Sequence, residues 1–124
     1  MLAFSFYVLS AAGLAGVVLA LLHLRATSPA QRPPWVSGAV HGVGGAIGLA
    51  LLLIALRDPP RGALNGTASF GLQAAVFLGG AIATGIGIIV LARRRGQATS
   101  LMMAVHGLLA VTGYVLLAAY VSLG

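Results

Sequence analysis

Residues 35–56 read WVSGAVHGVGGAIGLALLLIAL, a run of 22 residues without a permanently charged side chain. A helix needs about 20 apolar residues to cross the hydrocarbon core of a bilayer, so this run is long enough to span a membrane. Three more runs of similar length and character occur, at residues 2–24, 70–92 and 100–123. The sequence therefore predicts an all-α integral membrane protein with four transmembrane helices.

The composition favours the same fold class. Of the 124 residues, 60% are hydrophobic and 6% are charged, and a soluble domain of this size cannot bury so much apolar surface. The net charge of +6 comes from arginines in the short stretches between the apolar runs, a pattern typical of topology signals rather than of nucleic-acid binding. We expect one transmembrane domain, residues 1–124, in the lipid bilayer, with no nucleic-acid partner.

The arginines also indicate an orientation. The first and third connections together hold five arginines, whereas the second connection, residues 57–69, holds two arginines and the acid Asp58. The positive-inside rule then places the first and third connections in the cytoplasm and both termini on the non-cytoplasmic side, in a bacterial inner membrane. The second connection contains Asn65-Gly66-Thr67, a glycosylation sequon that we interpret as a turn.

The second and fourth apolar runs resemble each other. Aligned without gaps, residues 39–56 and 104–121 share seven identities, where about two are expected by chance for so biased a composition. The identical residues of the first stretch are Ala39, Val40, His41, Gly42, Gly48, Leu51 and Leu52. The tails of the first and third runs, LLHLR and VLARR, are also similar. We therefore predict an up-down bundle made of a duplicated helical hairpin, with repeats at 1–57 and 70–122.

One helical face in each aligned run carries a histidine followed by two small residues. The sets are His41, Gly45 and Gly48 in the second run, and His106, Ala110 and Gly113 in the fourth. Residues spaced in this way share a face, and the small side chains leave a slot for a flat group below the imidazole. Both histidines lie about 10–12 Å from the cytoplasmic ends of their helices, and hence at one depth.

This arrangement predicts a haem site. In a bundle of two hairpins the second and fourth helices lie on a diagonal, about 11–14 Å apart, which suits two imidazoles that bind one iron. We predict that His41 and His106 are the metal ligands of one b-type haem, since without cysteine no c-type attachment is possible. Two axial imidazoles leave no open position for a substrate, which favours electron transfer. Candidate donors to the haem propionates are Arg93, Arg94, Arg95, Arg25 and His23.

A family resemblance points the same way. His41, followed by Gly45 and a leucine-rich run that ends at Arg57, resembles the ligand helices of small four-helix membrane b-type cytochromes. The resemblance covers the second and fourth runs, and it implies electron exchange between a quinone and a partner redox subunit. Many relatives hold two haems with four histidines, but His23 is the only histidine here besides the pair, so we expect a single haem.

Three other functions compete with this prediction. The chain could be an accessory or assembly subunit of a membrane complex, with histidines that only bond neighbouring helices, or each histidine could bind a pigment. Cation or drug transport is disfavoured because the only acid, Asp58, lies in a connection rather than in the membrane. No nucleophile–base pair, carboxylate pair or open metal site is visible, so we expect an electron carrier or complex subunit rather than an enzyme in its own right.

Overall fold

The computed structural model describes residues 1–95 and 100–124, and the regular structure in these ranges is helical, with no strand. Four long α-helices are joined by short connections, the first of which contains the 3-10 turn η1. Their bounds are α1 Leu2–Arg25, η1 Pro29–Gln31, α2 Trp35–Ala55, α3 Phe70–Arg95 and α4 Ser100–Leu123. The four predicted runs therefore coincide with the four helices to within three residues at every end.

Each helix is long and apolar enough to cross a membrane. The starts and stops follow local chemistry. Pro34 precedes α2 with an extended backbone, φ −61° and ψ 147°, which fits a residue that cannot donate a backbone hydrogen bond. After α2 the chain reaches Asp58-Pro59, and a residue before proline is disfavoured in a helix. The fold is thus compatible with a four-helix membrane bundle.

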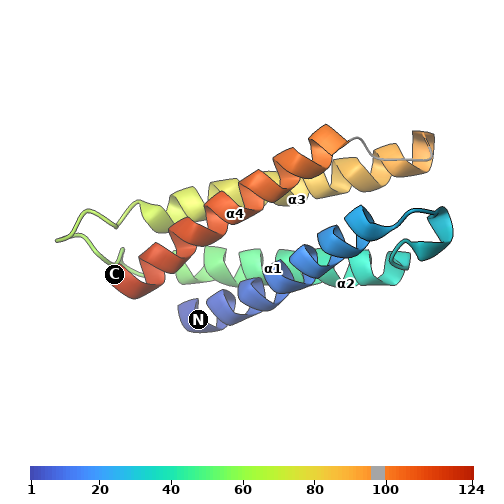
Figure 1. Ribbon diagram of the computed structural model, residues 1–124. Helices are drawn as coiled ribbons and strands as arrows, with labels where there is room; N and C mark the ends of the chain where they lie inside the picture. Colours follow the sequence, from blue (N-terminus) through green and yellow to red (C-terminus); the bar gives the residue numbers. More distant parts are fainter. Residues whose placement is uncertain (96–99) are drawn as a thin grey trace.

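The helices form two antiparallel hairpins, α1 with α2 and α3 with α4 (Figure 1). Packing is extensive within each hairpin and sparser between them, where α2 contacts α3 and α1 contacts α4. Helices α2 and α4 are not among the closely packed pairs, so they lie on a diagonal of the bundle, as the hairpin order predicts.

The tightly packed core occupies one end of the bundle. Its buried members are Leu9, Leu52, Ala74, Ala75, Leu78 and Leu117. All of them lie in the parts of the helices nearest the connection between α2 and α3. This connection is at the left of Figure 1. From residues 13 to 44 on the first hairpin, and from 82 to 109 on the second, none of the side chains that the structure describes is buried. The other end of the bundle is therefore only loosely filled.

The connection between α2 and α3 is held by hydrogen bonds to itself and to the C-terminus. The Asn65 side-chain oxygen accepts bonds from the Thr67 hydroxyl, at 2.8 Å, and from its backbone N–H, at 3.3 Å. The Asn65 amide also donates to the Leu123 carbonyl, and the Tyr120 hydroxyl accepts from the Arg61 N–H at 3.3 Å. Asn65 and Gly66 lie in a turn, as the Asn-Gly pair predicts.

Candidate functional site

His41 is held by the first helix of its own hairpin. Its Nδ1 lies 2.8 Å from the backbone carbonyl oxygen of Ala12 on α1, and the ring is half-buried. A carbonyl can only accept a hydrogen bond, so Nδ1 carries a proton, and in the neutral ring the lone pair is then on Nε2. The ring lies close to Gly16, where an added Cβ would be 2.7 Å from its Cε1 atom.

His106 is held in the same way in the second hairpin. Its Nδ1 lies 2.8 Å from the carbonyl oxygen of Ala81 on α3, and a Cβ added at Gly85 would be 3.2 Å from its Cε1. The Thr84 hydroxyl is a further neighbour, 3.5 Å from Nδ1, but it already donates to backbone carbonyls of α3. Nδ1 is therefore the protonated nitrogen of both imidazoles.

The two rings meet across the diagonal of the bundle. The His41 and His106 ring centroids are 6.0 Å apart, with an angle of 81° between the ring planes. Two imidazoles on opposite sides of one metal, with metal–nitrogen bonds of about 2 Å, would have their centroids about 6 Å apart. The planes of two such rings can take any mutual angle about the shared axis. The observed separation and angle are therefore compatible with two ligands of one metal.

Both Nε2 atoms are available for coordination. Neither forms a hydrogen bond, and among the described residues no buried side-chain nitrogen or oxygen lacks a partner. Each Nε2 must therefore border accessible space. Among the described residues, no cluster of three or more histidine, cysteine or acidic side chains could hold a metal ion. The candidate metal ligands are therefore His41 and His106 alone. Neutral imidazole with its other nitrogen bonded to a carbonyl is a typical metal ligand.

The structure places the predicted small residues in two different settings. A Cβ at Gly48 would lie 2.6 Å from Leu9 Cγ, and one at Gly113 would lie 2.8 Å from Leu78 Cγ. Leucines of α1 and α3 thus fill the space over these two glycines. The predicted slot for a flat group is therefore absent at Gly48 and Gly113. A Cβ at Gly45 would meet nothing within 4 Å, so room remains there.

Ala110, the counterpart of Gly45 on α4, is half-buried. Of the four small residues predicted to border a cofactor, Gly45 and Ala110 therefore remain candidates. Gly48 and Gly113 instead serve helix packing within the hairpins.

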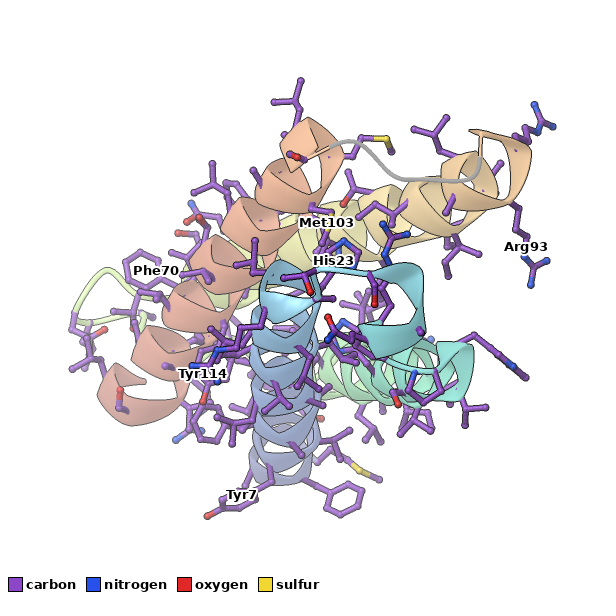
Figure 2. All side chains as sticks on the ribbon, turned by 45° about the vertical axis from the view of Figure 1, so that its right-hand side comes forward. Tyr7, His23, Phe70, Arg93, Met103 and Tyr114 are labelled. Atoms are coloured by element: carbon purple, nitrogen blue, oxygen red, sulfur yellow. The ribbon has the colours of Figure 1, made fainter. Side chains whose placement is uncertain are left out.

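The predicted cationic residues lie at the loosely filled end of the bundle but not beside the histidines. Arg93 and Arg94 are exposed in the last turn of α3, and Figure 2 shows Arg93 reaching away from the ribbon. Arg25 is exposed at the end of α1, with His23 half-buried next to it. The side chain of Arg95 lies outside the described residues. The exposed side chains of Arg25, Arg93 and Arg94 can therefore meet an anionic group at this end of the bundle.

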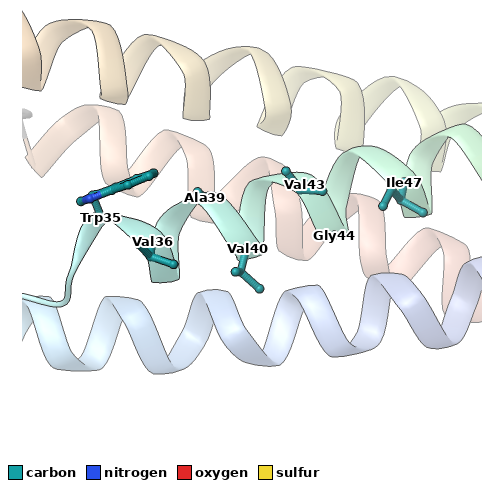
Figure 3. A pocket seen from close by; sticks show the side chains of 7 residues that line it. All are labelled: Trp35, Val36, Ala39, Val40, Val43, Gly44 and Ile47. Atoms are coloured by element: carbon teal, nitrogen blue, oxygen red, sulfur yellow. The ribbon is translucent and has the colours of Figure 1, made fainter.

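Two apolar grooves lie near His41 on the first hairpin. The larger, about 470 Å³, follows one face of α2 from Trp35 to Ile47 (Figure 3). The smaller, about 260 Å³, lies between α1 and α2 and includes His41 itself. Neither includes a residue of α4, so neither is the space between the two histidines.

Sequence reasoning missed the partners of the histidines. Ala12 and Ala81 act through their backbone carbonyls, which any residue type possesses, so no composition signal identifies them. A signal was nevertheless present in the spacing, because the pairs Ala12 and Ala81, and Gly16 and Gly85, are each separated by 69 positions. The similar tails of α1 and α3 have the same separation.

The sequence matches no protein-family model, and no curated protein or solved structure is detectably similar to the chain.

Proposed function

We propose that this chain is a membrane electron-transfer subunit that holds one b-type haem between His41 and His106. Helices α1 to α4 would span the bilayer of a bacterial inner membrane, with the arginine-rich connections in the cytoplasm and both termini outside. The subunit would relay electrons between a quinone pool and a redox partner in the membrane. The observation that carries the proposal is the pair of half-buried imidazoles, 6.0 Å apart on the diagonal of the bundle.

The tautomer of the histidines supports this proposal. Both Nδ1 atoms donate to helix carbonyls, at 2.8 Å in each case, so both Nε2 lone pairs are free to bind a metal. A bound haem would supply a one-electron redox centre, and two axial imidazoles would leave the iron no open position for oxygen. The chain itself supplies the ligands, fixes their tautomer and keeps them in an apolar environment.

The distribution of packing gives further support. No described side chain is buried between the histidines and the cytoplasmic ends of the helices, so a flat group can enter there without displacing the core. The arginines at that end, Arg25, Arg93 and Arg94, are exposed and suited to bond two propionates.

The matched contacts of the two hairpins support an origin by duplication. Each hairpin seats its histidine on a carbonyl of its first helix and packs a leucine of that helix over a glycine of the second. We propose that the repeats at 1–57 and 70–122 arose in this way, and that each contributes one axial ligand.

Absorption spectroscopy tests the haem proposal. The full chain is purified in detergent after expression with haem supplied, and spectra are recorded oxidised and reduced. We expect a Soret band, a reduced α band typical of b-type haem and one haem per chain. Replacing His41 or His106 by alanine should each abolish bis-histidine absorption, whereas the control His23→Ala should retain it. A colourless wild-type preparation, or a full spectrum in either ligand variant, would contradict the proposal.

One observation also favours a second candidate, an accessory or assembly subunit. The bonds from Nδ1 to Ala12 and Ala81 join helices within a hairpin, which a purely structural histidine also does. In that case the alanine variants would lower stability without changing any absorption. A green preparation with two pigments per chain would instead indicate pigment binding by separate histidines.

A further inference from the structure

Two glycines lie directly against the imidazoles. Gly16 comes four residues after Ala12 on α1, and Gly85 comes four residues after Ala81 on α3, so each glycine is one turn beyond the carbonyl that its histidine uses. A Cβ at Gly16 would be 2.7 Å from His41 Cε1, 3.2 Å from Nδ1 and 3.4 Å from Nε2. The imidazole therefore occupies the place of the missing side chain.

We infer that Gly16 and Gly85 are positioning residues, which let each imidazole lie on the helix backbone so that Nδ1–H reaches the carbonyl and Nε2 remains free for a metal. The inference rests on the proposed haem ligation for its functional meaning. The hydrogen bond itself, with Nδ1 2.8 Å from the carbonyl oxygen in each hairpin, does not depend on a bound metal. Both glycines are half-buried and lie against the imidazoles.

The contacts also say what an added methyl group would do. The nearest atom to a Cβ at Gly16 is the far edge of the His41 ring, a movable side chain, rather than backbone. The helices can therefore stay in place while the ring turns away and loses its bond to Ala12. At Gly85 the nearest ring atom is 3.2 Å away, so a small adjustment of His106 suffices and the effect is weaker.

Nitrogen NMR of the histidine rings tests this inference without a cofactor. The chain has three histidines, so protein labelled with ¹⁵N-histidine in detergent gives few signals, assigned with the His23→Ala and His41→Ala variants. In the wild type we expect both His41 and His106 in the Nδ1–H form. Gly16→Ala should move His41 toward the Nε2–H form and leave His106 unchanged, and Gly85→Ala should affect His106 to a smaller degree.

Matched controls are available on the same helices. A Cβ at Gly13 meets nothing within 4 Å, and one at Gly79 makes only an ordinary contact at 4.0 Å, so Gly13→Ala and Gly79→Ala should leave both rings unchanged. Circular dichroism should show wild-type helix content in all four variants. With haem supplied, Gly16→Ala should weaken binding about 10–100-fold, as loss of a ligand's hydrogen-bond partner does elsewhere.

The outcomes separate the two proposals. The wild-type spectrum alone can overturn the inference, if it shows His41 or His106 in the Nε2–H form. Unchanged His41 signals in the Gly16→Ala variant would also overturn it. If the wild type takes up no haem but the ring signals respond as expected, the haem proposal is overturned and the seating of the imidazoles by the two glycines stands.

Discussion

The hairpin α1–α2 and the hairpin α3–α4 share their geometry but not their polar side chains. Both hold a histidine on an alanine carbonyl, both leave a glycine beside the ring, and both pack a leucine over a glycine. They differ at Ser5, whose hydroxyl bonds the Gly48 carbonyl while the equivalent residue is Ala74, and at Thr84, whose equivalent is Ala15. The comparison shows that the contacts that hold the histidine are common to both hairpins. The hydrogen bonds of Ser5 and Thr84, in contrast, each occur in one hairpin only.

The largest effect on stability is expected from truncating the leucines of the shared contact. Leu9 is 5% exposed and Leu78 is 8% exposed, and each packs against a glycine of the partner helix. Leu9→Ala and Leu78→Ala should each lower the free energy of unfolding by about 2 kcal/mol, at the low end for buried leucines if the bundle lies in lipid as proposed, since lipid adds no hydrophobic drive. Unfolding in sodium dodecyl sulfate, followed by circular dichroism, measures this. If the losses of unfolding free energy in the two variants differ more than twofold, the leucine contacts of the two hairpins are not equivalent.

A somewhat smaller loss is expected from filling the glycines. A Cβ at Gly48 or at Gly113 meets a leucine Cγ at 2.6 or 2.8 Å, so alanine at either position should cost about 1–2 kcal/mol. At Gly42 and Gly107, which are also equivalent in the two hairpins, a Cβ meets nothing within 4 Å. Alanine at these two control positions should be neutral or stabilising, because glycine is a poor helix former. The same detergent titration serves, and a neutral Gly48→Ala would argue against close packing there.

The polar difference at Ser5 should matter less. Its hydroxyl donates to the Gly48 carbonyl at 2.9 Å and is fully buried. Ser5→Ala makes the first hairpin resemble the second and should cost about 0.6 kcal/mol, the average for a hydrogen bond between membrane helices. Ser122→Ala, which removes an exposed bond within one helix, is the control and should have no measurable effect. A loss above that of Leu9→Ala would show that the first hairpin depends on this bond.

The smallest effect is expected at Thr84. Its hydroxyl donates to the Gly80 carbonyl at 3.0 Å and is 3.5 Å from His106 Nδ1, too far to hold the ring. Thr84→Ala should change the free energy of unfolding by less than about 0.5 kcal/mol. Only the ¹⁵N signal of His106 Nδ1 should move, while that of His41 stays unchanged. Release of His106 from the Nδ1–H form in this variant would show that the second hairpin seats its histidine differently.

Much of the fold was accessible from the sequence because charge-free runs and their breakers are local signals. The runs at 35–56 and 100–123 match α2 and α4 within one residue, and Pro34 and Asp58-Pro59 mark where α2 starts and stops. The diagonal placement of His41 and His106 followed from the order of the hairpins.

The finer parts of the site were not accessible in this way. A stripe of small residues predicts space but not what fills it, and in the structure Leu9 and Leu78 occupy the space over Gly48 and Gly113. The hydrogen-bond partners of the histidines are backbone carbonyls, and the sequence marks Ala12 and Ala81 only as equivalent positions, through their spacing of 69 residues. Only the three-dimensional meeting of α1 with α2, and of α3 with α4, identifies them.

The one-sided packing of the bundle has a consequence for how the protein would be assembled. The buried leucines of the core pack the two hairpins together beside the α2–α3 connection. The opposite end, with its histidines and arginines, has no buried core among the described side chains, so the proposed haem would enter there without disturbing the packed end. If the proposed haem binds, we expect the polypeptide to fold first and to take up the haem afterwards.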